Sequence, residues 1–237
     1  MSVSPTKIDA VADGIYRIHT PVAEVPGGFS FNQYLIVDDA PLLFHTGPRK
    51  LFPLVSAAIE RVMPLETLRY VGFSHVEADE CGAMNDFLAA APEAEIVCGR
   101  VAAMVSVGDL ADRAPKALGD GEELSLGKKK VRWLDAPHLP HGWDAGYIAE
   151  ETTRTLFCGD LFTQPGAEHA PVTSGDILGP SEAFRAVMDY FAHGPHTAAL
   201  LAKLAKTEPR LLACMHGAAW EGNGADLLGA LGKALAG

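Results

Sequence analysis

The sequence predicts one α/β (α+β) domain over residues 1–237, in which two mixed β-sheets pack face to face and helices cover their outer faces. Its opening consists of short alternating strands, and its middle follows a strand, loop and helix order. The second half returns to antiparallel strands before it closes with helices. Two β-rich parts, each flanked by helices, favour two sheets over one. With 48% hydrophobic residues, a chain of this length can bury a substantial core.

The first half of the chain begins with strands and then alternates strands with helices. Gly and Asp turns separate the opening strands, and Pro64 ends the first helix. From Leu68 onward, each apolar run is followed by a loop and a helical pattern. The predicted strands are 15–19, 31–37, 41–45, 68–73 and 95–98, and the predicted helices are 51–62, 82–91 and 100–107.

The second half is predicted to pair antiparallel strands through Gly-containing and charged turns. A stretch without periodicity, 163–180, follows and either lines a functional site or serves only as a connection. Predicted helices then begin at Ser181, after Pro195 and near Gly224. The predicted strands are 122–126, 130–134, 145–150, 155–157 and 210–215.

Composition and charge exclude several classes of protein. A net charge of -11, with Lys128–Lys130 as the sole basic cluster, argues against nucleic-acid and anionic-membrane partners. The N-terminus lacks the apolar region of a signal peptide, and no run of about 18 apolar residues predicts a membrane span. We therefore expect a cytoplasmic protein. Its four cysteines are far apart in the sequence, which favours buried reduced thiols over disulfides.

The stretch Ser74–Gly82 lies between a predicted strand and a predicted helix, where a turn exposes side chains at a sheet edge. His75, Glu77 and Asp79 alternate at period two, which in an extended loop directs them toward a common point. Glu80 adds a fourth candidate ligand. Taken alone, the same residues also fit a solvated acidic turn that caps a helix.

Three further ligand-type side chains follow predicted strands. His138 comes after the run that ends at Pro137, Asp160 ends the run 155–159, and His216 ends the run 210–215. Strand ends that repeatedly carry only His and carboxylate groups predict a two-metal site.

With this set in place, the chain resembles the metallo-β-lactamase superfamily over nearly its whole length. The resemblance rests on 32–37, 42–47, the His75 loop, His138, 158–160 and 216–217. Hydrolases of the superfamily usually show H-x-H-x-D-H, whereas this loop has Glu77 in the second His position, as in the di-iron branch of flavodiiron and related oxygen-binding proteins. The resemblance implies a metallo-β-lactamase-like αβ/βα sandwich. It also implies that one metal is bound by His75, Glu77 and His138, that the other is bound by Asp79 and His216, and that Asp160 bridges them.

Three His and three carboxylates form a nitrogen and oxygen ligand set that suits iron or manganese well and zinc acceptably. We therefore expect two metal ions, with iron favoured, and no flavin in this chain. No catalytic residue is predicted beyond the metal centre. Glu80 departs from the usual His, so that it either coordinates the second metal or points away.

Three other residues are candidates for contacts around the metal ligands. His45 could hydrogen-bond to a ligand or cap its strand end. His141 could hydrogen-bond to a metal ligand. A loop His without any metal role is the more common case. Tyr34 could line the cavity, although an aromatic residue near a strand end more often belongs to the core.

Two functions remain open at this stage. The favoured one is a di-iron protein that binds or reduces O2 or NO, either as a sensor or as an oxidoreductase that needs an external electron donor. Its partners would be a diatomic ligand or small-molecule substrate and a redox protein, with a homodimer as a compatible assembly. The alternative is a metal-dependent hydrolase of the same superfamily that uses a metal-bridging hydroxide.

Overall fold

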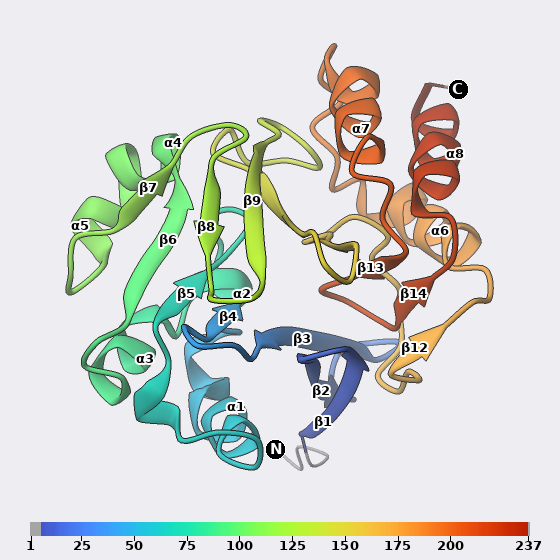
Figure 1. Ribbon diagram of the computed structural model, residues 1–237. Helices are drawn as coiled ribbons and strands as arrows, with labels where there is room; N and C mark the ends of the chain where they lie inside the picture. The colour runs from blue at the N-terminus through green and yellow to red at the C-terminus, as the bar shows by residue number, and fades with distance from the viewer. Residues whose placement is uncertain (1–5, 237) are drawn as a thin grey trace.

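The computed structural model describes residues 6–236, which form two seven-stranded mixed sheets (Figure 1). Sheet A has the order β1-β2-β3-β4-β5-β6-β7, and sheet B has the order β12-β14-β13-β11-β10-β9-β8. The strands of sheet A are β1 (Lys7–Ala12), β2 (Ile15–Val22), β3 (Phe29–Ile36), β4 (Leu42–Phe44), β5 (Tyr70–Gly72), β6 (Glu95–Gly99) and β7 (Lys116–Leu118). Those of sheet B are β8 (Glu123–Ser125), β9 (Lys130–Asp135), β10 (Gly146–Glu150), β11 (Thr155–Phe157), β12 (Val172–Thr173), β13 (Leu211–Ala213) and β14 (Ala219–Glu221).

Helices flank the two sheets on their outer sides (Figure 1). On the side of sheet A they are α1 (Phe52–Ile59), α2 (Ala78–Cys81), α3 (Met84–Ala90), α4 (Arg100–Ala102) and α5 (Gly108–Leu110). On the side of sheet B they are α6 (Leu178–Met188), α7 (Thr197–Ala205) and α8 (Gly224–Ala236). No helix within residues 6–236 is long and apolar enough to cross a membrane.

Alternation along the strands produces the layers. In β4, Leu43 packs with the helices outside sheet A, whereas Phe44 faces the opposite sheet. In β11, Leu156 packs toward the outer helices and Phe157 meets Phe44 between the sheets, with ring centroids 5.5 Å apart. These are the packing contacts of an αβ/βα sandwich, which confirms the predicted fold class.

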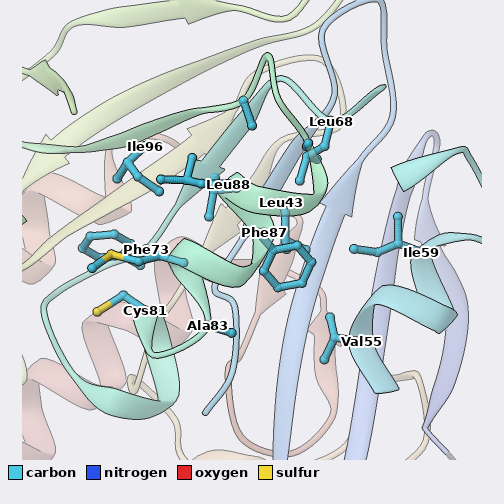
Figure 2. Packing of buried hydrophobic residues seen from close by; sticks show 14 of the residues in the cluster. Leu43, Val55, Ile59, Leu68, Phe73, Cys81, Ala83, Phe87, Leu88 and Ile96 are labelled. Carbon is cyan, nitrogen blue, oxygen red and sulfur yellow. The ribbon is translucent and has the colours of Figure 1, made fainter. Parts of the chain in front are cut away.

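The outer core of sheet A surrounds the segment that carries the predicted metal ligands. Figure 2 shows Phe73 and Cys81 among the apolar side chains of this cluster, close to α3. Phe73 is fully buried, and it ends the apolar run that leads into the His75 loop. All four cysteines are free and buried, as the sequence predicted.

Several predicted elements differ from the structure. The strands β1, β7, β12 and β14 were not predicted, since three of them have only two or three residues and depend on their neighbours for pairing. The helix expected at 100–107 is interrupted by a π-helical segment, Ala103–Val107. Helix α6 begins at Leu178 rather than at Ser181, because Pro180 is tolerated in a first helical turn, where its missing N–H needs no partner.

Candidate metal centre

The segment after β5 carries four candidate ligands at the edge of sheet A. His75 is 97% buried, and Glu77 retains an extended backbone with φ -142° and ψ 156°. The helical turn α2 starts at the next residue and carries Asp79 and Glu80. The expectation of an extended loop therefore holds only as far as Glu77, because the favourable helix start directs Asp79 and Glu80 to different places.

Sheet B supplies the remaining ligand-type groups from its strand ends. Asp160 follows β11 after Gly159, whose φ of +47° favours glycine. A Cβ at Gly159 would also lie 2.6 Å from Ser74 Oγ, so the two sheets approach closely at this turn. His216 follows β13, and its Nδ1 lies 2.8 Å from the Ser30 carbonyl oxygen of β3. That contact fixes the imidazole with Nε2 facing the other ligand-type groups.

One group of donor atoms combines His75, Glu77, His141 and Asp160, whose ligand atoms lie within 4.8 Å of one another. The His75 and His141 Nε2 atoms are 2.9 Å apart, and Glu77 Oε2 is 2.9 Å from the first and 3.1 Å from the second. Asp160 Oδ2 is 3.7 Å from His75 Nε2 and 3.5 Å from His141 Nε2. Neighbouring ligands around one ion with bonds of about 2.1 Å have separations of this size.

A second group forms around His216. Its Nε2 is 3.2 Å from Asp160 Oδ1 and 3.6 Å from Asp79 Oδ2. Asp160 therefore directs one carboxylate oxygen to each group. This arrangement could hold two cations side by side with Asp160 between them.

The protonation of these groups indicates a site suited to positive charge. Burial disfavours the imidazolium of His75, yet the Glu80, Glu77 and Asp160 carboxylates raise the pKa of His75 to about 12. Hydrogen bonds with His141 and then His75 hold the pKa of Glu77 well below its usual range. Burial, helped by neighbouring carboxylates and opposed by His216, raises the pKa of Asp79 to about 6. In the metal-free protein, protons occupy sites that a bound cation would take.

His138 does not join either group. It is exposed, with a φ of +64°, and its backbone N–H donates to the Gly142 carbonyl in a turn. The same turn brings His141 into the cluster, where its Nδ1 lies 2.8 Å from the Tyr190 carbonyl oxygen. The structure therefore brings His141 to the ligand-type groups, whereas it leaves His138, predicted as a ligand, outside them.

The other predicted residues have different surroundings. Glu80 is fully buried and points back toward Ser74 and the backbone of His75, rather than toward Asp160. His45 is also fully buried, with its Nε2 3.7 Å from Glu80 Oε1. Tyr34 belongs to the core between the sheets, and its hydroxyl donates to the Cys214 carbonyl at 2.8 Å.

Sequence reasoning missed residues that hold the loops together. Asp144 Oδ2 accepts a hydrogen bond from Val76 N at 2.9 Å, which ties the His141 loop to the His75 loop. Asn32 Nδ2 donates to the Cys214 and Gly217 carbonyls, at 2.8 and 2.7 Å, on either side of His216. An Asn within a predicted strand gave no signal of this role, because its partners are backbone carbonyls remote in sequence.

Two packed mixed sheets with outer helices and a His and carboxylate cluster at their shared edge define a metallo-β-lactamase-like protein. The chain belongs to the family described as "ODP family beta lactamase", whose model matches residues 29–217. Its homologues are flavodiiron proteins, and the chain matches their core domain. The predicted resemblance is thus confirmed.

Three relatives illustrate the match. A nitric oxide reductase of Moorella thermoacetica is 28% identical over 169 residues, covering 65% of this chain and 42% of that protein. A rubredoxin-oxygen oxidoreductase of Megalodesulfovibrio gigas is 27% identical over 172 residues, covering 71% and 42%. The crystal structure of the flavodiiron protein from Giardia intestinalis superposes with a TM-score of 0.82 at 19% identity, covering 97% of this chain and 59% of that one. The chain thus spans less than half the length of these two sequence relatives.

Proposed function

We propose that this protein holds two iron ions and binds or reduces O2 or NO at them. The observation that carries the proposal is the position of Asp160, whose two oxygens face two separate sets of donor atoms. In this assignment His75, Glu77 and His141 share the first ion with Asp160. Asp79 and His216 share the second with it, and Glu80 binds neither.

The donor set supports iron in particular. It offers only imidazole nitrogen and carboxylate oxygen, and its three carboxylates offset most of the charge of two divalent cations. Bound iron would supply the redox chemistry. The residues of the chain orient the ligands, through the Ser30 and Tyr190 carbonyls, and hold negative charge beside them.

The surroundings of the second group favour a small ligand. Here the chain supplies two carboxylates and one imidazole, so that coordination positions remain for an added molecule. The ring of Phe29 lies against His216 with centroids 4.4 Å apart, and Phe31 lies edge-on to it at 5.6 Å. Aromatic side chains on this side limit access of water, which suits an apolar diatomic molecule.

The two sequence relatives favour reduction over hydrolysis, because they are named for reactions with nitric oxide or oxygen. Such reductions consume electrons and protons. We propose that a separate redox protein delivers the electrons in the cytoplasm, and that without this donor the protein acts as a gas-binding sensor.

Anaerobic loading with Fe(II), followed by exposure to NO or O2, tests this function. We expect a new visible absorption band with either gas, its loss in Asp160→Asn, and little turnover of lactam, thioester or phosphodiester substrates by the Zn(II) form. If the Zn(II) form hydrolyses one of these at about one per second or faster while the Fe(II) form ignores both gases, the hydrolase alternative is correct.

The assignment of the loop histidines has a matched control within one turn. His141→Ala should lower the metal content of the purified protein from two ions toward one, whereas His138→Ala should leave it unchanged, since His138 is exposed. Elemental analysis of both variants measures this. The opposite pattern would restore His138 as the ligand.

A further inference from the structure

Glu80 lies directly behind His75, on the side away from the other metal-ligating candidates. It is fully buried. Its Oε2 accepts hydrogen bonds from the backbone N–H of Ser74 at 3.1 Å and of His75 at 2.7 Å. The Ser74 hydroxyl lies 2.6 Å from both carboxylate oxygens. These contacts tie helix α2 to the end of β5.

The remaining oxygen of Glu80 faces the imidazole of His75. His75 Nδ1 is 3.2 Å from Glu80 Oε1 and equally 3.2 Å from Ser74 Oγ, whose own proton goes to Glu80, while Nε2 points to Glu77, His141 and Asp160. A neutral imidazole carries one proton, and a carboxylate can only accept. When a metal displaces the proton from Nε2, the one proton left on the neutral ring lies on Nδ1, where the Glu80 side of the ring offers an acceptor.

A carboxylate offers about four lone-pair directions, and here two backbone amides, one hydroxyl and one imidazole take them. An additional metal bond would require Glu80 to abandon buried donors, each of which costs about 1–3 kcal/mol when left unpaired. His45 does not compete for this carboxylate, because its Nε2 at 3.7 Å is beyond hydrogen-bond distance. The hydrogen-bonding contacts of the Glu80 carboxylate are thus all with Ser74 and His75, and none is left for a metal.

From these contacts we infer that Glu80 is a positioning residue, which fixes the Nδ1–H tautomer and the ring orientation of His75 so that Nε2 binds the metal. The inference rests on the proposed metal site but not on the identity of the gas. A hydrogen bond from a ligating imidazole to a carboxylate also increases the basicity of the ligating nitrogen. Loss of such a partner typically lowers metal affinity about 10–100-fold.

The wild-type protein itself provides the first test. In the Zn(II)-loaded, ¹⁵N-histidine-labelled protein at one fixed pH, NMR should show His75 protonated at Nδ1 and metal-bound at Nε2, with a slowly exchanging Nδ1 proton. Zn(II) binding through Nδ1, or a proton on Nε2, would overturn the inference without the need for any variant. A failure to react with NO or O2 would contradict the proposed function and leave this result standing.

Variants supply the second test. Glu80→Ala should weaken Zn(II) binding about 10–100-fold in a competition with a chromophoric chelator and accelerate exchange of the Nδ1 proton. Glu80→Gln should lie between Ala and wild type, since its single amide oxygen can still accept from Nδ1. The exposed Glu66 provides the matched control, and Glu66→Gln should change neither quantity. If Glu80→Gln and Glu80→Ala fold and both keep the wild-type Zn(II) affinity and Nδ1 proton exchange rate, the inference is refuted. Loss of one of the two bound ions without any change in the His75 NMR signals would refute it as well.

Discussion

Asp79 should destabilise the metal-free protein at neutral pH. Its carboxyl is mostly buried, with 23% of its side chain exposed, and burial together with nearby carboxylates raises its pKa from 3.8 to about 6. Each unit of pKa difference corresponds to about 1.4 kcal/mol. Deprotonated Asp79 therefore lowers the free energy of unfolding by about 3 kcal/mol above pH 6.

The sign of the pH dependence follows from the raised pKa. Below pH 3.8 the carboxyl is protonated in both the folded and the unfolded state, so Asp79 and an uncharged Asn differ little. Between pH 3.8 and about 6 the unfolded chain releases its proton while the folded protein retains it, so the stability contributed by the protonated form is lost as pH rises.

Urea unfolding of the chelator-treated protein measures this effect. We expect Asp79→Asn to be more stable than wild type by about 3 kcal/mol at pH 8, with the difference disappearing near pH 4. The exposed Asp109 on α5 supplies the control, and Asp109→Asn should leave the stability unchanged at both pH values. With saturating metal the order should reverse, since Asn is the poorer ligand. Equal gains at pH 4 and pH 8 would show that packing, and not charge, is responsible.

Three further outcomes follow from the packing and the site. Gly146→Ala should lower the free energy of unfolding by about 1–3 kcal/mol, because a Cβ there would overlap the indole of Trp133; thermal unfolding followed by Trp fluorescence measures it, and an unchanged Tm would contradict the overlap. Asn32→Ala should lower it by about 1–3 kcal/mol in urea unfolding, since the Cys214 and Gly217 carbonyls lose their donor, and a neutral result would mean that water replaces the amide. Removal of bound metal by EDTA should lower the stability by about 2.7 kcal/mol relative to protein with free metal at one hundred times Kd; no change in Tm would argue against a site formed only in the folded state.

The sequence predicted the strand ends well because buried strands have a simple signal. Asp160 and His216 end apolar runs, and strands β11 and β13 are parallel neighbours, so their carboxyl ends bring both side chains to one edge. The two sheets were predicted from the alternating pattern of their strands alone. Strands β7, β12 and β14 escaped prediction because their pairing partners, and not their own residues, define them.

Loop geometry explains where the structure differs from the expected arrangement of site residues. Residues 138–142 place two histidines within one turn, whose backbone is left-handed at His138, and of the two it is His141 that lies with the ligand-type groups. Local composition does not specify that backbone. Likewise, the period-two spacing from His75 to Asp79 predicts an extended loop, but a helical turn begins at Ala78. This turn places Glu80 behind His75 instead of beside Asp79.

The shared edge of the two sheets also constrains the order of events when this protein is made. The loop after β5 carries His75, Glu77 and Asp79, while His141, Asp160 and His216 come from sheet B. Backbone hydrogen bonds from Gly146 to Ser74 and from Asn32 to Met215 join the two sides at this place. Neither half of the chain holds a complete set of the proposed ligands, so on this proposal tight metal uptake follows the release of the segment with His216 from the ribosome and the docking of the halves. The rate at which metal is incorporated during refolding then measures the rate of that docking step.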